Sequence, residues 1–125
     1  MLLYTTVGTN DLAAAVSFYD QIFRSVDIHR LIDFGARGIA WGVSWDTPSF
    51  AVLTPYDGQP ATVGNGSMVA LNVATREGVD TLYAQALALG GRDEGAPGLR
   101  DGNFYAGYFR DLDGNKLCAF TIVKG

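Results

Sequence analysis

Few residues in this chain of 125 could carry out acid–base, nucleophilic or metal chemistry, and they form no familiar set. The only histidine, His29, stands near the start of an expected strand, where a lone histidine is more often a surface or packing residue than a ligand. The only cysteine, Cys118, has Leu117 and Ala119 as neighbours, and a strand cysteine in apolar surroundings is usually an inert thiol. No serine–histidine–aspartate set can be supported around His29, and no glycine-rich phosphate-binding motif occurs.

Aromatic side chains are the most plentiful material for a binding site. Rings of this kind line pockets for flat or apolar ligands. Eight of them fall on expected strands or at strand ends: Trp41, Trp45, Phe50, Tyr56, Phe104, Tyr105, Tyr108 and Phe120. Tyr105 and Tyr108 have opposite parity along their strand, so the sequence leaves open which of the two points inward.

The elements that must position these residues repeat once along the chain. The first half predicts a strand, a helix capped by Asn10 or Asp11, and three strands, at 2–9, 11–23, 27–34, 38–46 and 49–55. The second half repeats this order, with Thr75 as the helix cap, at 67–74, 76–89, 91–94, 103–110 and 115–123. A shift of 64 residues relates the halves and places Tyr19 on Tyr83.

We therefore expect an α+β fold in one domain, residues 1–125, built from two βαβββ modules. The modules span about 1–56 and 67–125 and are joined by a glycine-rich linker at 57–66. Packed side by side, they are expected to pair into a curved mixed sheet that encloses a cleft, where small ligands bind.

Strand alternation groups further candidates on single faces that could line this cleft. The pairs are Tyr4 with Thr6, Met68 with Asn72, and Cys118 with Phe120. Such a cleft is apolar, with a phenol hydroxyl and an amide as its polar groups. The alternative is that the two halves fill this space with their own side chains.

The composition supports a folded chain, because 48% of the residues are hydrophobic and only 18% are charged. A net charge of −4 without any basic cluster argues against nucleic acid and anionic membranes as partners, and favours a cationic or neutral ligand. One cysteine excludes an intrachain disulfide. No signal peptide or transmembrane run is evident, so we expect a soluble, cytoplasmic protein.

Two motifs resemble those of the vicinal-oxygen-chelate superfamily, which includes glyoxalases, bleomycin resistance proteins and extradiol dioxygenases. The first is the run 10–12, Asn-Asp-Leu, followed by Ser-Phe-Tyr at 17–19. The second is the aromatic strand from Phe104 that ends in Arg-Asp-Leu-Asp-Gly-Asn at 110–115, with Leu112 where the family usually has proline. The resemblance covers nearly the whole chain and implies the glyoxalase/bleomycin-resistance fold, with both motifs serving to build it.

The resemblance also implies where a divalent metal would be held. The four positions fall at Tyr4, Met68, Cys118 and within 49–55, where Thr54 is the candidate. Phenol and thioether groups are poor ligands for hard or borderline metals, and a lone thiol does not make a zinc site. We therefore expect no metal and no other cofactor, and by pseudo-symmetry we expect Tyr4, Met68 and Cys118 to converge on one concavity.

The resulting hypothesis is a metal-free small-molecule-binding protein of the glyoxalase/bleomycin-resistance type, which the resemblance implies to be a homodimer. Its expected ligand-binding residues are Tyr4, Thr6, Trp41, Phe50, Met68, Asn72, Tyr105, Tyr108, Cys118 and Phe120. The alternative is an enzyme, either a glyoxalase-like lyase or isomerase or a dioxygenase-like protein with atypical ligands. Tyr4 and Cys118 are then the candidate catalytic residues.

Overall fold

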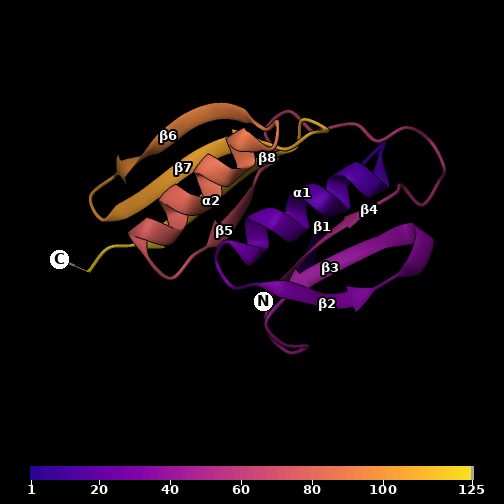
Figure 1. Ribbon diagram of the computed structural model, residues 1–125, viewed down its shortest axis with the longest axis horizontal. Coiled ribbons are helices and arrows are strands. Elements are labelled where there is room, and N and C mark those ends of the chain that lie inside the picture. The colour runs from indigo at the N-terminus through magenta and orange to yellow at the C-terminus, as the bar shows by residue number, and fades with distance from the viewer. Residues whose placement is uncertain (125) are drawn as a thin grey trace.

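The computed structural model describes residues 1–124 and contains two successive βαβββ modules (Figure 1). The first consists of β1 (Tyr4–Gly8), α1 (Leu12–Arg24), β2 (His29–Asp33), the short 3-10 helix η1 (Gly35–Arg37), β3 (Gly38–Gly42) and β4 (Ser49–Leu53). The second consists of β5 (Val69–Asn72), α2 (Arg76–Ala88), β6 (Arg92–Arg100), β7 (Phe104–Arg110) and β8 (Lys116–Ile122). The expected fold class and element order are confirmed.

The two helices follow the predicted repeat. Both have 13 residues, and their N-caps, Asp11 and Thr75, stand 64 positions apart in the sequence. Each cap side chain accepts a hydrogen bond from the backbone N–H three residues later, which satisfies a donor that the first turn of a helix would leave unpaired. Neither helix within residues 1–124 is long and apolar enough to cross a membrane.

Each module forms its own four-stranded sheet. The strand order is β1-β4-β3-β2 in sheet 1 and β5-β8-β7-β6 in sheet 2, and in both the first strand of the module runs parallel to the last. The two sheets are not hydrogen-bonded to each other; instead α1 packs against α2, and one hydrophobic core runs through both modules. One face of each sheet is therefore turned toward the helices, and we call the other its open face.

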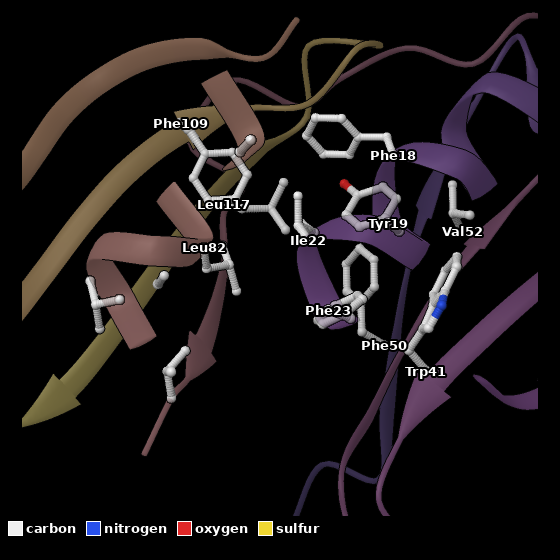
Figure 2. Packing of buried hydrophobic residues seen from close by; sticks show 14 of the residues in the cluster. Phe18, Tyr19, Ile22, Phe23, Trp41, Phe50, Val52, Leu82, Phe109 and Leu117 are labelled. Carbon is white, nitrogen blue, oxygen red and sulfur yellow. The ribbon is translucent and has the colours of Figure 1, made fainter. Parts of the chain in front are cut away.

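The first module is packed around aromatic rings. Tyr19 and Phe23 of α1 lie against Trp41 and Phe50, with ring centroids 4.8 to 5.7 Å apart for the four pairs that join helix and strands (Figure 2). Trp41 is 1% and Phe50 4% exposed. We had expected these two rings to line a cleft, and their place in the core under α1 corrects that expectation.

The second module has a core of smaller side chains. Leu82 of α2 packs with Phe109 and Leu117 of sheet 2, and Figure 2 shows Ile22 of α1 pointing toward this group. In the first module, by contrast, the large ring of Trp41 is fixed both by packing and by a hydrogen bond from its indole N–H to Asp20. The core is thus continuous, with its aromatic material concentrated in module 1.

Strand β6 differs most from the sequence prediction. We expected a short strand at 91–94, whereas β6 has nine residues and continues through Gly95, Pro97 and Gly98. Proline is tolerated because β6 is an edge strand, where a missing N–H costs no ladder hydrogen bond if it faces outward. Two register irregularities, between Asp93 and Gly98, take up the extra residues.

A buried carboxylate joins the two sequence motifs. Asp111 in the β7–β8 turn accepts a hydrogen bond of 2.5 Å from the hydroxyl of Tyr19 and one of 2.9 Å from the side-chain amide of Asn115. Its other oxygen accepts the backbone N–H groups of Asp113 and Asn115, each at 2.9 Å. The Asn115 amide also donates to the carbonyl of Gly8 at 3.0 Å. The turn of module 2 is therefore tied directly to β1 and α1 of module 1.

Tyr19 is held neutral in this environment. Burial raises the pKa of its hydroxyl well above the usual value of 10.0, and the nearby carboxylate of Asp111 raises it further. The folded state therefore favours the protonated phenol. This contribution to stability is complete below about pH 10 and is lost as the pH rises above it, because the unfolded chain then releases a proton that the folded chain retains.

Replacing Tyr19 with phenylalanine should lower the free energy of unfolding by about 1 to 3 kcal/mol, the usual range for a hydrogen bond to a buried charged group. Tyr83→Phe is the matched control, since Tyr83 occupies the equivalent position on α2 and donates to the exposed Asp93 at 2.7 Å. That substitution should cost less than about 1 kcal/mol. Denaturant unfolding monitored by circular dichroism gives both values.

The stability difference between wild type and Tyr19→Phe should narrow above about pH 10, since only the wild type loses the contribution of a neutral Tyr19. Equal costs for the two tyrosine variants at neutral pH would show that Asp111 does not depend on Tyr19.

Candidate functional site

The open face of sheet 2 collects most of the residues that were expected to bind a ligand. Cys118 pairs with Ala70 of β5 and with Tyr108 of β7, and the next row of the ladder carries Asn72 and Phe120. Because side chains two residues apart share a face, all five lie on the same side of the sheet. Met68, 45% exposed, precedes β5 with the same parity as Ala70.

Tyr4 and Thr6 lie on a different surface. They belong to β1, pair with Ser49 and Ala51 of β4, and have the parity opposite to Phe50, so they occupy the open face of sheet 1. Tyr4 is 62% exposed. Among the surface hollows within residues 1–124, three of about 390 to 490 Å³ are lined by other residues than Tyr4, Met68 and Cys118. The convergence of these three residues stays a prediction that one chain does not fulfil by itself.

Tyr105 belongs to the helix side of sheet 2. Its hydroxyl donates to Asp80 of α2 at 2.6 Å, and the guanidinium of Arg76 lies 4.5 Å from its ring centroid. Tyr105 is 8% exposed. This placement corrects the expectation that it lines a cleft and answers the question that parity left open: Tyr108 is the tyrosine that shares a face with Cys118.

Tyr108 lies at the centre of the open face of sheet 2. The guanidinium of Arg100 and the ammonium of Lys116 each lie 5.7 Å from its ring centroid. Beyond it, the half-buried rings of Phe104 and Phe120 are stacked with centroids 4.8 Å apart and an angle of 21° between their planes. These two cations were not among the expected site residues: Lys116 shares its strand parity with Cys118, but Arg100 lies beyond the strand expected at 91–94.

The Tyr108 hydroxyl and the Cys118 thiol are both neutral at physiological pH. Burial is the largest cause that raises the pKa of each group above its usual value, and their proximity to each other adds to the shift for Tyr108. A neutral phenol and a neutral thiol can donate hydrogen bonds, but neither acts as a base or a nucleophile in that state. The centre of this face is therefore suited to binding rather than to covalent chemistry.

No carboxylate–histidine cluster accompanies these residues. Across the described part of the chain, no three side chains among His, Cys, Asp and Glu lie close enough together to hold a metal ion. The acidic group that shares this edge of sheet 2, Glu94, accepts a hydrogen bond of 2.6 Å from Arg110. His29 lies in module 1 and contacts the exposed Asp27 at 2.8 Å.

Comparison with known proteins gives one family. The model of the glyoxalase/bleomycin resistance protein/dioxygenase superfamily matches residues 2–119. No curated protein matches the chain.

Solved structures of the same family are similar over nearly their whole length. A glyoxalase/bleomycin resistance protein from Albidiferax ferrireducens T118 is 34% identical, with a TM-score of 0.87, and the match covers 98% of this chain and 99% of that one. A family enzyme from Burkholderia phytofirmans PsJN is 18% identical, with a TM-score of 0.74 and coverage of 96% and 97%. A lactoylglutathione lyase from Agrobacterium tumefaciens is also 18% identical, with a TM-score of 0.69 and coverage of 97% and 92%. The last two likenesses show the fold alone.

Cys118 should react with a chromogenic aromatic disulfide at least about 100-fold more slowly in the native protein than in denaturant. Its side chain has no exposed surface and burial raises its pKa, so both access and thiolate formation are suppressed. Because the chain has a single cysteine, the absorbance change reports this residue alone. Native reactivity near that of the unfolded chain would mean that the thiol is activated and available for catalysis.

Proposed function

The chain belongs to the glyoxalase/bleomycin resistance protein/dioxygenase superfamily, and from this premise we propose that it is a metal-free small-molecule-binding protein. The ligand lies on the open face of sheet 2, against Tyr108. The observation that carries this proposal is the Tyr108 hydroxyl, whose pKa is raised by burial, at the centre of a face that also bears the stacked rings of Phe104 and Phe120.

The residues at the expected metal positions do not fit a divalent ion. Cys118 is buried and its pKa is raised, whereas a thiol must lose its proton to bind a metal. Met68 offers only a thioether, and Tyr4 lies on the open face of the other sheet. This set of side chains supports the binding of a small molecule without a metal, because the side chains needed to hold the metal of a metal-dependent reaction are missing at these positions.

A second copy of the chain completes the site in this proposal. The open face of sheet 1 is built on small residues, including Ala40, Ala51 and Gly42, whereas that of sheet 2 carries bulky ones. Tyr4, Met68 and Ile122 expose apolar side chains on these two faces, at 62%, 45% and 48%. Sheet 1 of one copy set against sheet 2 of the other would cover this apolar surface and enclose a ligand.

The enzyme alternative has less support. It requires Tyr4 and Cys118 to act as a pair, but the thiol of Cys118 is buried and its pKa is raised. The name lactoylglutathione lyase belongs to a neighbour whose identity of 18% carries only the fold.

Purified protein should contain far less than one equivalent of nickel, zinc, iron or manganese per chain, and a chelator should leave its Tm unchanged. The reason is the unsuitable donor set at Tyr4, Met68 and Cys118. Elemental analysis and thermal unfolding measure the two quantities. One tightly held ion per chain, lost on substitution of Tyr4 or Cys118, would contradict a metal-free site.

Met68→Arg should abolish ligand binding while the chain still folds. The side chain is 45% exposed, so the new charge can reach water and folding is retained, but the longer arginine side chain fills space proposed for the ligand. Leu112→Arg is the matched control, because Leu112 is 44% exposed yet lies beside Gly90 at the end of α2. A thermal-shift screen of antibiotics, thiol conjugates and aromatic metabolites identifies the ligand, since binding to the folded state raises Tm.

Light scattering on the same samples should give about twice the chain mass of 13.4 kDa for the wild type. Absence of any Tm increase across the screen would refute small-molecule binding. If the protein is a monomer and still binds a ligand, only the proposal that a second copy completes the site would be wrong.

A further inference from the structure

Cationic side chains gather on the open face of sheet 2, although the chain as a whole is acidic. Four of its nine lysine and arginine residues occupy this face: Arg92, Arg100, Arg110 and Lys116. Three of them pair in one row across β6, β7 and β8. Glu94 accepts a hydrogen bond from Arg110, and Asp101 lies close enough to Tyr108 to raise its pKa, so the four cations outnumber these two carboxylates. This face is therefore locally positive.

Arg100 is seated by the glycines of β6. A Cβ atom on Gly98 would lie 2.8 Å from its Nη1 atom, and one on Gly95 would lie 3.5 Å from Nη2. Because Gly95 and Gly98 have no side chains, the Arg100 side chain can run along its own strand, where its Nη2 donates to the carbonyl of Ala96 at 2.7 Å. Its guanidinium is thereby brought to within 5.7 Å of the Tyr108 ring centroid.

Lys116 approaches the same ring from β8, on the other side of β7 from Arg100, and its ammonium also lies 5.7 Å from the ring centroid. Within residues 1–124, neither Arg100 nor Lys116 belongs to any of the three ion pairs. Two positive charges therefore lie equally far from the centre of the Tyr108 ring, and Arg100 pairs with Phe104, one of the two stacked rings. Charged donors next to an aromatic surface match a ligand that has an anionic group and a flat ring.

We propose that the ligand of this face is an aromatic anion, with its carboxylate or equivalent group between Arg100 and Lys116 and its ring against Phe104 and Phe120. The inference rests on the proposed function, because it names the class of ligand for the same site. It replaces the expectation of a cationic or neutral ligand, which followed from the net charge of −4. The hydroxyl of Tyr108 donates to the anionic group.

The test is isothermal titration of the complete chain with 2-naphthoate and with the uncharged 2-naphthamide, which has the same ring. We expect 2-naphthoate to bind at least about tenfold more tightly, since charge-assisted hydrogen bonds are roughly twice as strong as neutral ones. Arg100→Gln and Lys116→Gln should each weaken 2-naphthoate binding about tenfold and leave 2-naphthamide unaffected. All variants are first checked for wild-type Tm.

Arg76→Gln is the matched control for both variants. Arg76 also lies over a tyrosine ring, 4.5 Å from the centroid of Tyr105, but on the helix side of sheet 2, so its loss removes the same charge from the opposite face. It should leave 2-naphthoate binding unchanged. Equal affinities for the two probes, equal losses in all three variants, or no binding of 2-naphthoate at millimolar concentration would each overturn the aromatic-anion assignment.

These results are distinguishable from failure of the proposed function. If 2-naphthoate does not bind but neutral or cationic compounds raise Tm in the screen, the protein is still a small-molecule-binding protein and only the ligand class is wrong. If nothing raises Tm, the proposed function fails together with the assignment.

Discussion

The arrangement of the two modules depends on the burial of one carboxylate. Asp111 is 4% exposed and accepts four hydrogen bonds, one of them from Tyr19 in the other module. A buried charge is costly unless it is hydrogen-bonded, so the tyrosine that α1 presents stabilises the turn after β7 in its observed form. The side-chain amide of Asn115 in the same turn donates to the carbonyl of Gly8 and so fixes the end of β1. The two sequence motifs are thus the two halves of one contact.

The repeat explains why the modules resemble each other in backbone but differ in their surfaces. Tyr19 and Tyr83 are equivalent, yet one is buried against Asp111 and the other donates to the exposed Asp93. The open faces have diverged in the same way. Small residues line the open face of sheet 1, whereas Tyr108 and two stacked rings occupy that of sheet 2. The first face therefore leaves room for the bulky side chains of the second in the proposed pairing of two copies. Most of the residues proposed to bind a ligand therefore belong to module 2, whereas most aromatic residues of the core belong to module 1.

The sequence predicted the element order and both helix caps because these depend on local periodicity and on hydrogen bonds a few residues long. It did not predict which face of each strand the helix would cover. Alternation divides a strand into two sets, and Trp41, Phe50 and Tyr105 were assigned to the wrong one because only tertiary packing decides between them. The length of β6 was also missed, because Pro97 reads as a strand breaker unless the strand is known to lie at an edge.

The proposed aromatic anion differs from the cationic or neutral ligand that the net charge favours, for a related reason. It is a sum over the whole chain, whereas charges on the surface are screened over about 8 to 10 Å at physiological ionic strength. A ligand on the open face of sheet 2 therefore responds mainly to Arg100 and Lys116, and much less to carboxylates elsewhere on the molecule. The sequence did not place Arg100 beside Tyr108, because the strand expected at 91–94 ends before it, and the sequence could not show that Gly95 and Gly98 leave room for Arg100 to reach the ring. The proposed preference for an anion thus depends on two residues without side chains as much as on the two that carry the charge.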